Sequence, residues 1–131
     1  MRKIEFRAWD TLTKRYLYNI QAVTLTDESD DYHGLLTLAD FLNNDRYIVE
    51  QFTGLFDKTG EKIFENDIVT PADKPHLFGT VLYDDATGSY AVKYPHHDQK
   101  DAISNYTNKH RIKFKLKIWG TIHTQQALLG K

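Results

Sequence analysis

The clearest indications of the fold come from residues 47–69, which read YIVEQFTGLFDKTGEKIFENDIV. Its first seven residues are rich in aromatic and β-branched side chains, which is typical of a strand. Residues 57–60 (DKTG) predict a turn, because Asp favours the first position and Gly tolerates positive φ at the end. Asn66 is among the few non-glycine residues that tolerate a left-handed backbone. The stretch therefore predicts short antiparallel strands joined by tight turns.

Further strand patterns lie on both sides of this stretch. Residues 78–83 and 89–94 flank the sequence DDATG, which predicts a hairpin. Near the N-terminus, residues 3–8 alternate charged and apolar side chains, and residues 15–18 follow a turn-like segment, which predicts an N-terminal β-hairpin. A short strand is expected within residues 21–25, whereas the polar segment 95–106 is predicted to be irregular.

Two short helices are predicted, at about 38–43 and 124–129. In the first, Thr37 precedes an apolar stripe of Leu38, Phe41 and Leu42 at helical spacing. In the second, Thr124 is the expected cap. Residues 1–131 are thus expected to form a single, mainly β domain with a small, strongly bent antiparallel sheet or barrel. Its predicted core comprises Ile4, Phe6, Ala8, Ile48, Leu55, Ile63, Ile68, Val69, Val81, Leu82, Ile112, Phe114, Leu116 and Ile118.

The composition excludes several classes of protein. The chain has 131 residues, of which 40% are hydrophobic and 13% aromatic, so global disorder is not expected. It contains no cysteine, which excludes disulfides, thiolate nucleophiles and cysteine-ligated metals. It also has neither a long apolar run nor the apolar segment of a secretory signal, so we expect a soluble cytoplasmic protein.

The most specific physical feature is a basic strand pattern at residues 109–118, KHRIKFKLKI. In an extended chain its five cations would share one face over roughly 27 Å. Residues 109–131 carry six basic and no acidic side chains, whereas residues 1–108 carry a net charge of −7. The five cations, which are the candidate nucleic-acid-binding residues, are Lys109, Arg111, Lys113, Lys115 and Lys117.

Two interpretations of this basic pattern remain open. The cations could attract the phosphates of a nucleic acid, with Tyr106 stacking on bases. They could equally form the solvated face of an amphipathic strand, since edge strands often carry lysine to prevent edge-to-edge pairing. Trp9 and Trp119 lie at the ends of alternating strands, and we expect them to pack rather than to stack on a ligand.

Other chemistry has weaker support in the sequence. His96, His97 and Asp98, with Asp101 beyond, are of the types that bind divalent metals, but neighbouring side chains on an extended chain point to opposite sides. The acidic pairs Asp30-Asp31 and Asp84-Asp85, and Glu65 with Asp67, are expected to be structural. No phosphate-binding glycine loop or nucleophile elbow is present. We therefore expect no cofactor, no metal and no catalytic residues.

Three blocks of sequence resemble the YopX family of phage and prophage proteins. Residues 4–10, IEFRAWD, are similar to the family opening IKFRAWD. Residues 51–69 resemble the pattern Q-Y-T-G-L-x-D-x-x-G-x-x-I-Y-E-G-D-I-V, with Asn66 in place of a glycine. Residues 118–123, with the leucine pair at 128–129, resemble the family's I-G-N-I-Y ending, with Thr121 in place of asparagine. The resemblance implies a mainly β protein with an SH3-like barrel core and gives no catalytic or binding residues, because the family is functionally uncharacterised.

The sequence favours a non-enzymatic accessory protein of a phage or prophage that binds another macromolecule in the bacterial cytoplasm. A protein partner or a second copy of the chain is the first expectation, because small open sheets associate through their edges. One alternative is nucleic-acid binding through the basic strand 109–117. The other is a metal-dependent hydrolase that uses His96, His97 and Asp98.

Overall fold

Two antiparallel sheets dominate the computed structural model, which describes residues 3–22, 24–25, 35–106 and 115–130. The chain divides into two compact units, Met1–Phe52 and Thr53–Lys131. The mainly β class predicted from the sequence is confirmed. The predictions of one domain and of an SH3-like barrel stay predictions.

The first unit is built on the predicted N-terminal hairpin. Strands β1 (Phe6–Asp10) and β2 (Arg15–Tyr18) are antiparallel, and β1 also pairs with the first half of β5 (Tyr47–Phe56). A small second sheet joins β3 (Thr24–Leu25) to β4 (Leu35–Leu36). The core of this unit consists of Ala8, Ile20, Leu36 and Phe41, with Phe6, Leu17, Leu38, Tyr47 and Val49 packed against it.

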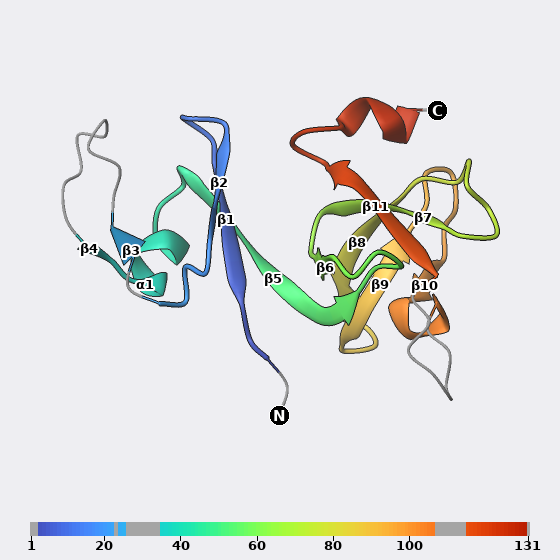
Figure 1. The fold of residues 1–131 in the computed structure, drawn as a ribbon, viewed down its shortest axis with the longest axis horizontal. Coiled ribbons are helices and arrows are strands. Elements are labelled where there is room, and N and C mark those ends of the chain that lie inside the picture. The colour runs from blue at the N-terminus through green and yellow to red at the C-terminus, as the bar shows by residue number, and fades with distance from the viewer. Residues whose placement is uncertain (1–2, 23, 26–34, 107–114, 131) are drawn as a thin grey trace. The chain divides into compact units, whose positions relative to one another are not determined.

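Helix α1 (Leu38–Leu42) confirms the first predicted helix, and Figure 1 shows it beside β3 and β4. Thr37 and Asp40 form a capping box, in which the Thr37 side chain accepts from the Asp40 N–H and the Asp40 carboxylate accepts from the Thr37 N–H. Phe41 is fully buried, but Leu42 is 60% exposed. Of the predicted apolar stripe, Phe41 is therefore buried whereas Leu42 is not.

The second unit contains a five-stranded antiparallel sheet in the order β10-β9-β8-β7-β11 (Figure 1). Its strands are β7 (Asp67–Pro71), β8 (Gly79–Asp84), β9 (Ser89–Lys93), β10 (Lys100–Ala102) and β11 (Leu116–Thr121). Strand β6 (Lys62–Phe64) lies next to β5 in the four-stranded sheet β2-β1-β5-β6. The core of the unit comprises Ile63, Val69, Val81, Tyr90, Val92, Tyr94, Ile103 and Leu116.

The turns follow the sequence closely. Strands β8 and β9 form the predicted hairpin, and the Gly60 N–H closes the predicted 57–60 turn on the Asp57 carbonyl at 3.0 Å. Asn66 has φ = 69°, as its left-handed tolerance predicts. In β11 the register shifts between Ile118 and Gly120.

Several expectations need correction. Segment 95–106 is not wholly irregular, because it contains β10 and the 3-10 helix η1 (Ile103–Tyr106). The second helix is a 3-10 turn, η2 (Gln126–Gly130), and the Thr124 hydroxyl accepts a hydrogen bond from the Thr121 N–H, within the turn that precedes η2. Of the basic strand, residues 116–118 are extended, whereas residues 109–114 lie outside the described residues.

The predicted core is largely but not wholly right. Ile4 is 58% exposed because it precedes β1, and Ile48 is 38% exposed because it lies on the opposite face of β5 from Tyr47 and Val49, which pack on the core. Ile112 and Phe114 lie outside the described residues. Buried as predicted are Ala8, Ile63, Ile68, Val69, Val81 and Leu116; half-buried are Phe6, Leu55, Leu82 and Ile118.

Candidate functional site

Asp57 is a buried carboxylate of the second unit that accepts four hydrogen bonds. Its side chain is buried, and one oxygen accepts hydrogen bonds from the Thr59 N–H (2.8 Å), the Thr59 hydroxyl (2.7 Å) and the Glu61 N–H (2.9 Å). The other oxygen accepts from the N–H of Ile118 in β11 at 3.1 Å. Burial raises the pKa of Asp57, but these hydrogen bonds outweigh burial, so the net pKa lies below its usual value. Asp57 thus holds the turn to the C-terminal strand.

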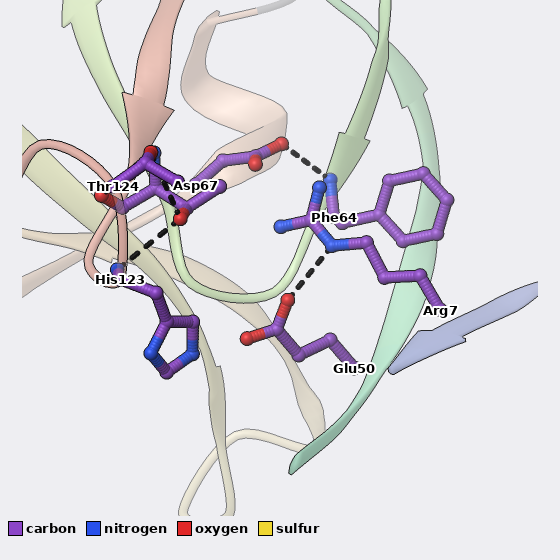
Figure 2. A network of polar contacts seen from close by, with 7 residues as sticks. Arg7, Glu50, Phe64, Asp67, His123 and Thr124 are labelled. Atoms are coloured by element: carbon purple, nitrogen blue, oxygen red, sulfur yellow. Dashed lines mark hydrogen bonds and ion pairs between the residues drawn. The ribbon is translucent and has the colours of Figure 1, made fainter. Parts of the chain in front are cut away.

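Asp67 plays a similar part at the following bend. Figure 2 shows its carboxylate directed at the main chain of Phe64, whose N–H donates to Oδ2 at 2.8 Å. The neighbouring Asn66 donates its N–H to the Val81 carbonyl and accepts from the N–H of Ile122. Asp67 thus has the structural role that the sequence predicts for it.

Buried charges of the first unit are also paired. The guanidinium of Arg7 donates from Nε to Glu50 at 2.7 Å (Figure 2), and both side chains are nearly inaccessible. Arg46 binds both oxygens of Asp10, at 2.8 and 2.7 Å. These pairs bridge neighbouring segments of one unit, and we assign them a structural role.

Trp119 stands out among the exposed side chains of the second unit. Its indole is 44% exposed, yet the ring is fixed because Nε1 donates to the buried Thr70 hydroxyl at 2.8 Å. Phe78 meets the indole edge to face, with the ring centroids 6.1 Å apart. The ammonium of Lys117 lies over the indole, 4.0 Å from the ring centroid. We call these residues, Thr70, Phe78, Lys117 and Trp119, the Trp119 surface.

The predicted nucleic-acid-binding residues are only partly described. Lys115 is exposed, and Lys117 is half-buried against Trp119. Lys109, Arg111 and Lys113 lie outside the described residues. Trp9 packs as expected, buried against Tyr16 on the next strand with ring centroids 4.9 Å apart. Trp119 packs against Phe78 but is 44% exposed, so the packing role expected from sequence accounts for part of its surface.

The segment around the two adjacent histidines is occupied by packing contacts. His97 lies against Tyr94, with the ring centroids 6.1 Å apart, and His96 has φ = 67°. Asp101 accepts a hydrogen bond from the Tyr106 hydroxyl at 2.9 Å. Within the described ranges no three His, Cys, Asp or Glu side chains are grouped to hold a metal ion.

A chain of hydroxyls links the elements after β9, and the sequence reasoning missed it. Tyr94 and Tyr106 share a hydrogen bond between their hydroxyls, and Tyr106 donates onward to Asp101. Burial raises the pKa of both tyrosines, and the hydrogen bonds to Tyr94 and Asp101 raise that of Tyr106 further. Tyr106, which the nucleic-acid interpretation offered for base stacking, is half-buried against the core. Its spacing from Tyr94 gives no signal of this contact in the sequence.

The fold and these sites define a small, mainly β protein whose buried ionisable groups fasten turns to strands. None of the described helices is long and apolar enough to cross a membrane. The chain belongs to the YopX family, whose description is "YopX protein", with residues 5–130 matched.

Its fold is similar to a solved structure from Enterococcus faecalis, that of protein EF1440. The TM-score is 0.61 and the sequence identity 25%, over 98% of this chain and 99% of that one. A comparison with curated proteins found no match.

Proposed function

We propose that this YopX-family chain is a non-enzymatic accessory protein of a phage or prophage, and that it binds another macromolecule in the cytoplasm of the bacterial host. The observation that carries the proposal is Trp119, a large aromatic side chain that is held in place and yet 44% exposed. Rigid aromatic groups are frequent anchors of macromolecular interfaces, because little side-chain freedom is lost on binding.

The ionisable groups support binding over catalysis. Asp57 and Asp67 are each 1% exposed and accept main-chain hydrogen bonds, which is a structural use of a carboxylate. Catalytic acids and bases need to reach a substrate. The exposed aromatic side chains are better suited to contact with a partner.

A protein partner, including a second copy of the chain, is the partner expected from sequence. Strand β10 is the outer strand at one end of the five-stranded sheet, and outer strands are common sites of association. At the other end, the Asp57 turn bonds to β11 through the Ile118 N–H and the Leu116 carbonyl. Association through the sheet is therefore expected at β10.

Light scattering over a wide range of protein concentrations tests self-association, and capture from phage-infected host cells tests other partners. We expect a dimer or larger oligomer, or a captured partner that rebinds in purified form. A monomer at every concentration that binds no purified protein and no nucleic acid would contradict the proposal.

The hydrolase alternative has a separate test, because it requires bound metal at His96, His97 and Asp98. Metal analysis of protein purified without nickel affinity distinguishes it from the proposed function. Stoichiometric metal that is lost in a His96→Ala and His97→Ala variant would contradict a purely binding role.

Nucleic acid is the second candidate partner. The contact between Lys117 and Trp119 specifically favours it, since cations and exposed aromatic rings together bind single strands.

A further inference from the structure

We propose that the Trp119 surface binds single-stranded nucleic acid, with a base stacked on the indole and a backbone phosphate held by Lys117. This inference rests on the proposed function and names the class of partner. It uses only residues of the second unit: Thr70, Phe78, Lys115, Lys117 and Trp119.

The indole is positioned in advance for stacking. Its Nε1–H is bonded to Thr70, whose own side chain is only 2% exposed, and Phe78 meets the ring at an interplanar angle of 65°. These two contacts fix the plane of the ring while 44% of the residue stays accessible. A base that stacks on this ring therefore orders no mobile side chain, which favours binding.

A cation lies directly against the ring on which the base would stack. The Lys117 ammonium is 4.0 Å from the centre of the indole, held by the attraction between a cation and an aromatic ring. Because this ammonium covers one face of the ring, a stacked base would lie on the part of the indole that Lys117 leaves open, and its phosphate would be drawn towards the ammonium. Lys115 lies two residues before Lys117 in an extended segment, so the side chains of both lysines leave the main chain on the same face.

The charge of the segment that carries Trp119 favours a polyanion. Residues 115–130 contain Lys115 and Lys117 and no acidic residue. In the pairing strand β7 the only acid is Asp67, which is buried in the Phe64 bend. A single strand is favoured over a duplex, because the bases of a duplex are already stacked on one another and leave no open face for the indole.

Fluorescence anisotropy with a labelled oligothymidylate of about 12 nucleotides tests the inference. Trp119→Ala is expected to weaken binding roughly 5- to 150-fold, the usual range for the loss of one stacked base. Trp119→Phe, which keeps an aromatic ring but loses the bond to Thr70, should weaken binding less than Trp119→Ala. The matched control is Tyr83→Ala, because Tyr83 is 45% exposed on β8 of the same sheet.

Lys117→Gln gives an independent test that leaves the indole and its bond to Thr70 in place. It should weaken binding and reduce the slope of log affinity against log salt by about 0.7, the value for one single-strand phosphate. Lys58→Gln, at an exposed lysine of the 57–60 turn, should leave the slope unchanged. Thermal melting of each variant shows whether it is folded. If Trp119→Ala is not folded, the binding and salt dependence of Lys117→Gln test the inference instead.

Three results would overturn the inference: no binding at low salt, equal losses in Trp119→Ala and Tyr83→Ala, or equally tight binding of polyglutamate, which would indicate an acidic protein partner. If the oligonucleotide fails to bind while the protein self-associates or retains a purified protein partner, this inference fails and the proposed function stands. If the protein binds no oligonucleotide, does not self-associate and retains no purified protein partner, both this inference and the proposed function fail.

Discussion

At Asp57 one carboxylate joins parts of the chain that are 61 residues apart in sequence. Oδ1 organises the turn through Thr59 and Glu61, and Oδ2 receives the N–H of Ile118. The sequence predicts the turn, because the signal for it is local. The contact with Ile118 was not predictable, since no spacing within residues 57–60 indicates which strand lies against them.

Asp57→Asn is expected to lower the free energy of unfolding by about 1–3 kcal/mol. The amide can keep its oxygen towards Thr59 and Glu61, but its NH₂ group then faces the Ile118 N–H, and two donors meet. Chemical denaturation measures the loss, with the exposed Asp85→Asn as control. Equal stability of the two variants would show that the Ile118 contact contributes nothing.

The free energy of unfolding should also decrease as the pH is lowered. Hydrogen bonds hold the pKa of Asp57 and of Asp10 below their usual value despite burial, so both carboxylates bind protons more weakly in the folded state than in the unfolded chain. Their contribution is complete above the unfolded pKa of about 3.9 and is lost as pH falls through the lower folded values.

Unfolding free energies measured from neutral pH down to about pH 3 should therefore decline most steeply at the acid end. Asp57→Asn should flatten that decline, because the side chain no longer titrates. If the unfolding free energy of Asp57→Asn depends on pH as steeply as that of the unchanged protein, the charge of the Asp57 carboxylate does not have this role.

At the scale of elements, patterns local to the sequence predicted the hairpins at β1–β2 and β8–β9 and the capped helix α1. Strand β10 and helix η1 were missed, because residues 100–106 have no apolar alternation and form through pairing with β9 and the packing of Ile103. The sequence placed Lys115, Lys117 and Trp119 on one strand pattern. It gave no sign that Trp119 would be held by Thr70 and remain exposed, since that depends on the register of β11 against β7.

Gly79 fixes how closely β8 packs against its neighbours. A Cβ at this position would lie 2.6 Å from Val92 Cγ1 and 2.7 Å from a ring carbon of Tyr94, both core residues. Gly79→Ala should therefore lower the free energy of unfolding by about 1–3 kcal/mol through overpacking. Gly130→Ala, where no heavy atom lies within 4 Å, is the control, and equal denaturation midpoints for the two would contradict the packing argument.

For the whole molecule, the division into two units falls within one strand. The first half of β5 pairs with β1, whereas Thr53 in its second half donates its hydroxyl to the Ile63 carbonyl. Because one strand carries hydrogen bonds of both units, we predict that residues 1–131 unfold as a single domain.

The two tryptophans allow this prediction to be tested unit by unit. Trp119→Phe leaves Trp9 to report on the first unit, and Trp9→Phe leaves Trp119 to report on the second. Fluorescence and circular dichroism should give coincident denaturation curves within each variant. Curves that separate would show two domains.

The buried polar groups of this fold have structural contacts, so we expect a partner to meet the exposed indole of Trp119. Nuclear magnetic resonance of ¹⁵N-labelled protein tests it directly, because each of the two indole N–H groups gives its own signal. On addition of oligothymidylate, the Trp119 signal should shift and the signal of the buried Trp9 should stay in place. A titration in which the Trp119 signal does not shift, or in which the Trp9 signal shifts as far, would show that the partner does not bind at this indole.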